Sequence, residues 1–266
     1  MCIRDRDSDE SLLAEARALW VDMAERVTFS RQDPGCLCSN AHYDVVLLEG
    51  KIIKRVDKEV HKMEYTDPAH RLVEAHPYVL IHEDVDLIQE LVRKLPKNRH
   101  VEVVDLGAGS GTTALSVLCA RPNRILVTTV DHSTLQWAQA VSKNIGRAED
   151  WRGIMSDSAE AAKEFKAGSV DLLMIDTDHT YKTTKGELKA WLPKIIKGGF
   201  VWLHNYADPA DLGVPNLPSP GVKQAIDEVV AAGQLELVKV GGLGWAGRKP
   251  IPARPQYPPK KGEKRA

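Results

Sequence analysis

Two short polar segments hold the residue types that can move a proton or bind a metal ion. Residues 176–179 read Asp-Thr-Asp-His and follow an apolar run, and residues 204–205 are a His-Asn pair after a second apolar run. A histidine, whose ordinary pKa is near ~6.5, can accept a proton from a hydroxyl at neutral pH. Carboxylate and imidazole groups also bind divalent metals. These segments therefore indicate acid–base chemistry, a metal site, or both.

A glycine-rich turn lies upstream, in residues 104–111, with the sequence Val-Asp-Leu-Gly-Ala-Gly-Ser-Gly. Glycine lets the backbone turn tightly and approach a ligand where a Cβ atom would collide. Asp131 ends the next apolar run, where a carboxylate can accept hydrogen bonds from two ribose hydroxyls. Asp157 lies where a third strand would end and could receive an adenine amino group. These residues together predict a cofactor site.

The elements that must position these residues alternate along the chain. Short apolar runs indicate buried strands, and the amphipathic stretches between them indicate helices. Such alternation specifies a parallel sheet with helices on both faces, and ligands bind at the carboxyl ends of its strands. We therefore expect the polar segments to meet beside the glycine turn. The predicted strands span 101–106, 125–130, 170–175, 200–203 and 235–240, and the predicted helices span 112–120, 133–145, 183–196 and 221–232.

The glycine turn and its acids resemble the class I S-adenosylmethionine-dependent methyltransferases. The resemblance implies a Rossmann-like α/β fold with a mostly parallel seven-stranded sheet, helices on both faces, and S-adenosylmethionine as cofactor. In that family the acid before the first glycine helps hold the methionine end, and the acids after strands two and three contact ribose and adenine. The implied cofactor-binding residues are Asp105, Gly107, Ala108, Gly109, Gly111, Asp131, His132, Asp157, Ser158 and Asp176.

The polar segments resemble the group that contains macrocin-type and rhamnosyl O-methyltransferases. Those proteins carry an Asp-x-x-His-x-Tyr segment, then a glycine pair, then a His-Asp-Tyr segment, and residues 176–181, 198–199 and 204–206 follow this order. The match covers roughly residues 101–245. Asn205 stands where the group most often has aspartate. The resemblance implies O-methylation of a small hydroxylated metabolite, such as a sugar or a natural product.

Catechol-type and caffeoyl-coenzyme-A-type O-methyltransferases offer a second comparison, which concerns the metal. They bind a divalent ion with an aspartate after strand four and an Asp-Asn pair after strand five. Asp176 and Asn205 match the first and last of these ligands, and His204 replaces the middle aspartate. This resemblance implies a Mg²⁺ or Mn²⁺ site at these three residues. One imidazole among the ligands shifts the preference from magnesium toward manganese, iron, cobalt or zinc.

We expect His179, Asp176 and His204 to form the catalytic group. The sulfonium of the cofactor is a strong electrophile, so the enzyme mainly has to align and deprotonate the acceptor. His179 lies three residues after Asp176, where catechol-type enzymes place a basic residue, so we prefer it as the base and place His204 second. A metal would do the same work by lowering the pKa of the hydroxyl. The structural alternative is that His179 caps a helix and Asp176 pins its loop.

The regions outside the cofactor domain are less regular. Residues 11–27 and 84–95 predict amphipathic helices, and residues 45–56 could form a short hairpin. The last residues are rich in proline and lysine, which is typical of a disordered tail. The predicted parts are an N-terminal helical, acceptor-covering segment over 1–96, a cofactor-binding methyltransferase domain over 97–247 and the tail over 248–266.

Composition and charge limit the partners. The net charge is −1, but residues 248–266 contain seven basic residues and one acid, so the remainder is acidic. An acidic body argues against a nucleic-acid surface and favours a small-molecule acceptor. No apolar run approaches ~18 residues, which argues against a membrane span. The four cysteines lack the spacing of a disulfide framework, so we expect a cytoplasmic protein. The sequence leaves a homodimer open.

Three other functions are compatible with part of the sequence. The acceptor could be nitrogen or a macromolecule, although an Asn/Asp-Pro-Pro-Tyr segment typical of amino-group acceptors is replaced here by residues 176–179. A nicotinamide-dependent oxidoreductase would carry G-x-G-x-x-G, and Thr112 occupies the last glycine position of that pattern. A non-catalytic cofactor-binding protein is disfavoured by the intact pair of Asp176 and His179.

Overall fold

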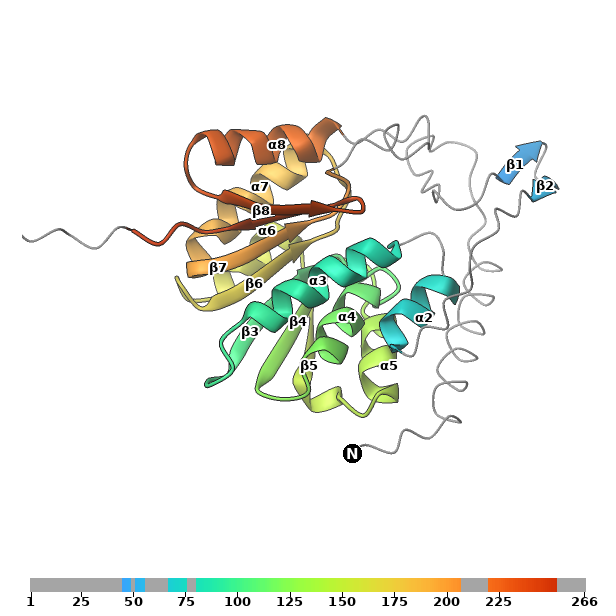
Figure 1. The fold of residues 1–266 in the computed structure, drawn as a ribbon, viewed down its shortest axis with the longest axis horizontal. Coiled ribbons are helices and arrows are strands. Elements are labelled where there is room, and N and C mark those ends of the chain that lie inside the picture. The colour runs from blue at the N-terminus through green and yellow to red at the C-terminus, as the bar shows by residue number, and fades with distance from the viewer. Residues whose placement is uncertain (1–44, 49–50, 56–66, 76–79, 207–219, 253–266) are drawn as a thin grey trace, which may run out of the picture.

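The computed structural model describes residues 45–48, 51–55, 67–75, 80–206 and 220–252 (Figure 1). The predicted helix over 11–27 and the tail beyond residue 252 lie outside the described residues. β1 (Val45–Leu48) and β2 (Lys51–Arg55) pair antiparallel, which is the short hairpin that the sequence predicts.

A seven-stranded sheet forms the centre of the protein (Figure 1). It consists of β3 (Val101–Leu106), β4 (Ile125–Asp131), β5 (Trp151–Met155), β6 (Val170–Ile175), β7 (Ile195–Leu203), β8 (Glu236–Gly241) and β9 (Gly244–Arg248). In space the strands lie in the order β5-β4-β3-β6-β7-β9-β8. Neighbours from β5 to β7 are parallel, whereas β9 pairs antiparallel with β7 and β8. The predicted Rossmann-like, mostly parallel sheet is confirmed. The five parallel strands, β3 to β7, all have their carboxyl ends at the same edge of the sheet.

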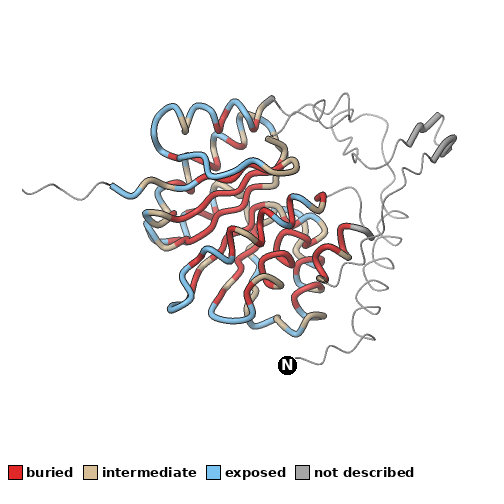
Figure 2. Tube along the Cα trace, viewed as in Figure 1, coloured by how far each residue is buried: buried red, intermediate tan, exposed pale blue. Residues whose placement is uncertain are grey.

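Helices cover both faces of the sheet (Figure 1). One layer contains α2 (Pro68–Ala75), α3 (His82–Lys94), α4 (Thr112–Ala120) and α5 (Gln136–Asn144), and the other contains α6 (Ser158–Ala161), α7 (Tyr181–Trp191) and α8 (Pro220–Ala231). Successive residues of a strand point to opposite faces. Val103 accordingly joins the core of the first layer, whereas Val104 and Leu106 join that of the second. All residues of β3 except Glu102, which is half-buried, are therefore buried (Figure 2).

The helices before residue 97 belong to this same folded unit. Leu72 of α2 and Ile88 of α3 share one hydrophobic core with Val103 of the central strand and Leu115 of α4. The predicted N-terminal segment therefore contributes two helices to the first layer. No helix among the described residues is both long and apolar enough to cross a membrane.

The sequence prediction is wrong about the last part of the sheet. It gives a strand over 235–240 and then only a short apolar stretch, whereas Gly244–Arg248 form β9 between β7 and β8. β9 is short and contains two glycines, which weaken the sequence signal for a strand. The predicted tail also starts too early, because Arg248 belongs to β9 and the Lys249 amide donates to the Gly199 carbonyl (2.8 Å).

The predicted helix over 183–196 is too long. α7 ends at Trp191, and residues 192–194 form a 3-10 turn that contains Pro193. Proline lacks the amide that would continue a helical hydrogen-bond ladder. β7 consequently begins at Ile195, five residues before the predicted start.

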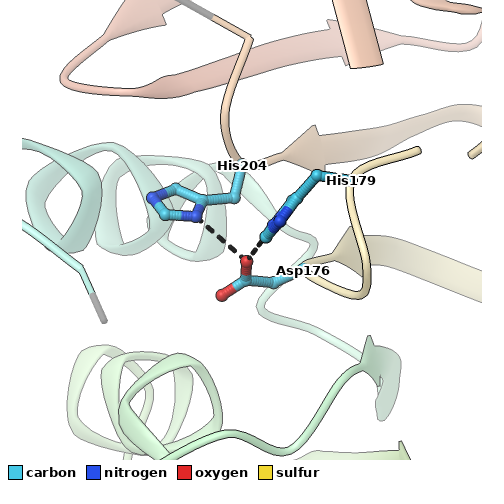
Figure 3. A group of neighbouring side chains, drawn as sticks. All are labelled: Asp176, His179 and His204. Atoms are coloured by element: carbon cyan, nitrogen blue, oxygen red, sulfur yellow. Dashed lines mark hydrogen bonds and ion pairs between the residues drawn. The ribbon is translucent and has the colours of Figure 1, made fainter. Parts of the chain in front are cut away.

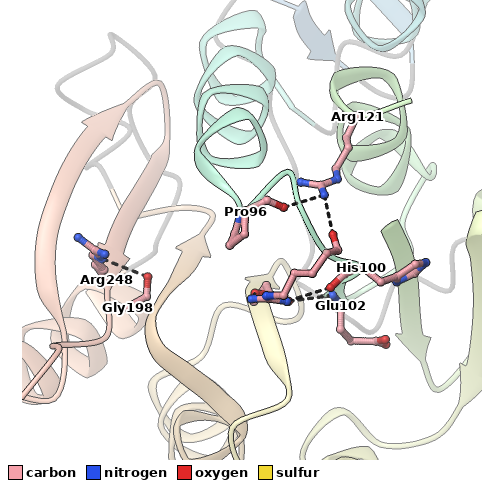
Figure 4. Close-up of polar contacts among 8 residues, drawn as sticks. Pro96, His100, Glu102, Arg121, Gly198 and Arg248 are labelled. Atoms are coloured by element: carbon pink, nitrogen blue, oxygen red, sulfur yellow. Dashed lines mark hydrogen bonds and ion pairs between the residues drawn. The ribbon is translucent and has the colours of Figure 1, made fainter. Parts of the chain in front are cut away.

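Ion pairs hold the amino-terminal edge of the sheet, which lies opposite the carboxyl ends of the parallel strands. Asp171 in β6 is 1% exposed and accepts hydrogen bonds from the Arg99 guanidinium and from the Glu102 amide (3.0 Å). Arg121 donates to the carbonyls of Pro96 (2.8 Å) and Arg99 (3.2 Å) beside this pair (Figure 4). A buried carboxylate needs partners of this kind, because an unpaired charge in the protein interior is strongly unfavourable. This edge therefore aligns β3 with β6.

Candidate active site

The candidate residues lie along the carboxyl edge of the parallel strands. Asp157 follows β5, Asp131 ends β4, the glycine turn follows β3, Asp176 follows β6 and His204 follows β7. Because these strands are neighbours in the order β5-β4-β3-β6-β7, the predicted cofactor residues other than Asp176 occupy one half of the edge. The predicted catalytic residues occupy the other half, next to the glycine turn.

The glycine turn takes backbone conformations that favour glycine. Gly107, Gly109 and Gly111 have φ angles of 93°, 44° and 81°. This left-handed region is strained for residues that carry a Cβ atom. The turn is held on both sides, since the Gly107 amide donates to the Val130 carbonyl (2.9 Å) and the Asp176 amide donates to the Leu106 carbonyl (2.9 Å). The sequence therefore fixes the path of the turn between β4 and β6.

Asp131 connects the glycine turn to the end of β4. Its Oδ2 accepts the Ala108 amide (2.9 Å), and its Oδ1 accepts the amide and hydroxyl of Ser133 (2.7 and 2.8 Å). Burial acts to raise the pKa of Asp131, but the amides of Ser133 and Ala108 outweigh it, so the pKa is lowered. The carboxylate therefore stays charged at the mouth of the site. His132, also predicted to contact the cofactor, is exposed beside it.

Asp105 lies within β3 and is fully buried. Its Oδ2 accepts the Thr129 hydroxyl (3.2 Å), while its Oδ1 has no hydrogen-bond partner among the described residues. Burial, and after it the neighbouring carboxylate of Asp176, raises the pKa of Asp105 well above its usual value. The surroundings of Asp105 therefore favour its neutral form, and one of its oxygens has no hydrogen-bond partner among the described residues.

Glu187, which the sequence analysis does not single out, ties the two halves of the edge together. It lies on α7, is fully buried, and accepts the hydroxyls of Ser158 (2.5 Å) and Thr177 (3.2 Å). Burial raises the pKa of Glu187 to about 7. The Ser158 hydroxyl is thus directed at α7, and Asp157 caps α6 by accepting two backbone amides (2.9 and 3.0 Å). The predicted adenine contact of Asp157 and the predicted cofactor-binding role of Ser158 stay predictions.

One carboxylate oxygen holds the two histidines together. Oδ1 of Asp176 lies 2.9 Å from Nε2 of His179 and 3.0 Å from Nδ1 of His204, and both rings converge on it (Figure 3). Side-chain exposure falls from 22% for His179 to 11% for Asp176 and 6% for His204. His179 is therefore the member that a ligand reaches most readily. One ligand atom from each residue lies within 4.8 Å of the others, which is close enough to share a metal ion.

Left-handed backbone conformations occur in both loops of this cluster. His179 has a φ of 60° and Asn205 a φ of 55°, and among the described non-glycine residues only Arg124 also has a positive φ. This conformation costs roughly 1–2 kcal/mol for a residue with a Cβ atom. Such strain concentrates at functional sites, where it is maintained because it aims a side chain. The role of Asn205 as a metal ligand stays a prediction.

A second carboxylate, missed by the sequence analysis, faces His204 from α3. Oδ2 of Asp84 lies 3.4 Å from Nε2 of His204, and Asp84 is fully buried. Burial acts to lower the pKa of His204, but Asp176 and Asp84 outweigh it and raise the pKa to about 10. Burial likewise acts to raise the pKa of Asp176, which the two imidazoles hold below its usual range. His204 is therefore an imidazolium at neutral pH in this structure.

A family profile matches the part of the chain that holds most of these residues. Residues 104–206 match the sequence profile of a family described as a methyltransferase domain. No curated protein sequence is significantly similar to the chain. This matched region contains the glycine turn, Asp131, Asp157 and the Asp176 cluster, whereas Asp84 lies outside it.

Solved structures share the fold at low sequence identity. A protein from Corynebacterium glutamicum superposes with a TM-score of 0.58 and 16% identity, over 72% of this chain and 94% of that one. A methyltransferase from Geobacter sulfurreducens gives 0.53 and 14%, over 68% and 86%. The O-methyltransferase of tomaymycin synthesis from Streptomyces achromogenes, in complex with S-adenosylmethionine, gives 0.50 and 14%, over 70% and 87%. The chain therefore shares the Rossmann-like fold of these solved structures, and residues 104–206 resemble a methyltransferase domain.

Proposed function

We propose that this protein transfers the methyl group of S-adenosylmethionine to a hydroxyl of a small-molecule acceptor. The observation that carries this proposal is the Asp176 carboxylate, which joins two histidines beside the glycine turn. Acceptor deprotonation needs a base at this position, because the cofactor binds over β3 to β5 and its methyl group must face the neighbouring half of the edge.

The described residues fit the cofactor. The unpaired Oδ1 of the buried Asp105 offers a polar contact near the turn, and the charged Asp131 lies at the end of β4. The glycines leave the backbone open to close approach. S-adenosylmethionine supplies an electrophilic methyl group when bound. The contribution of the chain is then to bind the cofactor, orient the acceptor and accept a proton.

We assign the proton-accepting role to His179. Its Nε2 bonds to Asp176 (2.9 Å), which fixes the ring and stabilises the imidazolium that forms when Nδ1 takes a proton. His204 serves less well, because two carboxylates already favour its protonated form. Asp176 is then an orienting group, as the carboxylate is in other Asp–His pairs.

The same three side chains also fit a divalent metal. Asp176, His179 and His204 offer one oxygen and two nitrogens, so His179 joins the ligand set of Asp176, His204 and Asn205 that the sequence predicts. Two imidazoles suit manganese, iron, cobalt or zinc better than magnesium. A metal held there would lower the pKa of an acceptor hydroxyl.

The proposed acceptor is a hydroxylated sugar or natural product. The order of residues in 176–181 and 204–206 resembles the macrocin-type and rhamnosyl O-methyltransferases, which supports a hydroxylated sugar or natural product. One structure with the same fold is the O-methyltransferase of tomaymycin synthesis.

An acceptor screen tests this function. The purified protein is incubated with S-adenosylmethionine and paired hydroxyl and amine acceptors, with and without Mn²⁺, and S-adenosylhomocysteine is measured. We expect turnover with hydroxyl acceptors, its loss in Asp176→Ala, and its retention in Glu160→Ala, which removes an exposed acid on α6. Turnover with amines alone, or full activity in Asp176→Ala, would contradict the proposal.

A further inference from the structure

We infer that Asp84 is a positioning residue that keeps a proton on Nε2 of His204 and thereby directs Nδ1 of His204 toward Asp176. The inference rests on the proposed function in assigning the Asp176 cluster to the reaction. Asp84 lies on α3, outside the region that matches the methyltransferase family.

The two nitrogens of His204 face two different carboxylates. Nδ1 lies 3.0 Å from Oδ1 of Asp176, and Nε2 lies 3.4 Å from Oδ2 of Asp84. Among the described residues Nε2 has no hydrogen-bond partner, so Asp84 is the group that can accept its proton with a small adjustment. The ring of His204 also stacks on Trp202, with centroids 5.7 Å apart. The ring plane is therefore supported from a third direction.

The burial of Asp84 requires an explanation. Asp84 is fully buried, although a charged carboxylate in a protein interior is unfavourable without partners. Its position three and four residues before Leu87 and Ile88 places it on the apolar face of α3. A helix cap alone could be supplied by an exposed acid, so capping does not account for a carboxylate this deep.

Asp84 is itself rigidly held. Its Oδ2 accepts the Ile81 amide (3.2 Å), and its Oδ1 accepts the Leu243 amide (3.0 Å) in the turn between β8 and β9. That turn approaches so closely that a Cβ atom on Gly242 would lie 2.8 Å from Oδ1 of Asp84. The Leu243 carbonyl in turn accepts the Tyr206 amide (2.8 Å), two residues after His204. Asp84 and the His204 loop are therefore held by the same turn.

The direction of the proton follows from the chemistry of the two groups. A carboxylate accepts hydrogen bonds, so the His204 nitrogen that faces Asp84 carries a proton both in the imidazolium and in the neutral form that would bind a metal through Nδ1. The opposite nitrogen, Nδ1, donates to Asp176 in the imidazolium and would bind a metal once it has lost its proton. A carboxylate that holds a histidine in this way fixes its tautomer and ring orientation. Replacing Asp84 would leave the His204 ring in place but would remove the acceptor that holds the proton on Nε2.

The first test observes the proton directly. The protein is labelled with ¹⁵N-histidine, and the signals of His204 are assigned from their absence in His204→Gln. We expect a slowly exchanging, downfield-shifted Nε2–H in the wild-type protein, and a loss of that shift in Asp84→Asn. The matched control is Glu83→Gln, which removes an exposed acid from the same helical turn. A wild-type Nε2 without a proton, or an unchanged Nε2–H in folded Asp84→Asn, would overturn the inference.

Asp84→Asn also disturbs the contacts with Ile81 and Leu243, so it could unfold the protein. The wild-type spectrum then decides, since it needs only His204→Gln for its assignment and not Asp84→Asn.

The second test measures metal affinity with Co²⁺, whose visible spectrum reports the ligand geometry. We expect Asp84→Asn to weaken Co²⁺ binding by roughly 10- to 100-fold, which is the usual effect of losing a carboxylate behind a histidine ligand, and Glu83→Gln to leave it unchanged. Equal binding by Asp84→Asn and the wild type would count against the role of Asp84. A wild-type protein that binds no Co²⁺ would contradict the proposed metal site instead, and the proton signal would still decide the role of Asp84.

Discussion

Gly107 and Asp176 approach each other more closely than any side chain at residue 107 would allow. A Cβ atom on Gly107 would lie 2.0 Å from the backbone carbonyl oxygen of Asp176. The glycine turn of the cofactor half and the first residue of the catalytic half are therefore in direct backbone contact. The glycine that the sequence assigns to cofactor binding therefore packs against the backbone of the carboxylate that we propose to be catalytic.

We expect Gly107→Ala to destabilise the protein and weaken cofactor binding together. The φ of 93° strains alanine, and the clash with a backbone atom cannot be relieved by a side-chain rotation. Gly233→Ala is the matched control, because Gly233 has a φ of 67° and a Cβ atom added there would meet no other atom within 4 Å. Denaturant unfolding should show a loss for Gly107→Ala that exceeds the control by about 1–3 kcal/mol. Equal losses in the two variants would show that the contact with Asp176 is easily relieved.

Asp131→Ala should weaken S-adenosylmethionine binding by roughly 1–3 kcal/mol, because the ribose hydroxyls lose a charged acceptor. The Ala108 amide loses its acceptor as well, so the glycine turn should loosen in the free protein. Calorimetric titration with S-adenosylmethionine and with S-adenosylhomocysteine measures the effect, and Glu149→Ala serves as an exposed control. NAD binding without a response to either adenosyl ligand would contradict the cofactor assignment.

The strand ends and the residues that follow them could be predicted from the sequence. β3 and β6 have the predicted bounds, because continuous apolar runs bordered by polar residues give a clear signal. The order of parallel strands then brings Asp176 and His204 together without any knowledge of side-chain contacts. Local pattern and topology were sufficient for this part of the site.

Asp84 and Glu187 could not be predicted in the same way, because their partners are distant in sequence. Asp84 contacts Leu243, 159 residues away, and Glu187 of α7 contacts Ser158 at the start of α6. Each carries one available signal, an acid on the apolar face of a helix, but periodicity alone does not identify the partner. The strand β9 was missed for a different reason, since its glycines interrupt the apolar pattern.

Glu187 should make the stability of the protein depend on pH. Burial raises its pKa from the usual 4.5 to about 7, so the unfolded chain loses this proton at lower pH than the folded protein does. The free energy of unfolding therefore has its full value, as far as Glu187 is concerned, below pH 4.5. It falls as the pH rises from 4.5 to 7, and above pH 7 Glu187 causes no further change. The fall amounts to about 3 kcal/mol.

Glu187→Gln removes this dependence, because glutamine stays neutral and can still bond the hydroxyls of Ser158 and Thr177. We expect the variant to be more stable than the wild type at pH 8 and to lack the corresponding slope between pH 4.5 and 7. Denaturant unfolding over this range measures it, with the exposed Glu160→Gln as control. Parallel pH profiles for wild type and Glu187→Gln would show that Glu187 is ionised throughout the range.

His179→Ala should lower the rate of methyl transfer by roughly 10²–10⁴-fold, which is the usual contribution of a general base. Affinity for S-adenosylmethionine should stay within a few-fold of the wild type, because His179 lies on the β6 half of the edge. The measurement is kcat with an acceptor from the screen, together with cofactor affinity by calorimetry. Loss of cofactor binding in His179→Ala, or an unchanged rate, would assign His179 to the structure of the loop.

Removal of a metal provides the last prediction. If Asp176, His179 and His204 hold a divalent ion against the acceptor hydroxyl, chelation abolishes turnover and leaves cofactor affinity largely intact, because most of the predicted cofactor residues lie at the ends of β3 to β5. Asp176→Ala should then behave like the chelated enzyme, since it removes the only carboxylate among these three ligands. We expect Mn²⁺ or Co²⁺ to restore the chelated wild type better than Mg²⁺, because two imidazoles disfavour magnesium. Full turnover after chelation, with a large loss in His179→Ala, would show that the cluster works as a base without a metal. Turnover that is indifferent to chelation and to both substitutions would place the active site elsewhere on the protein.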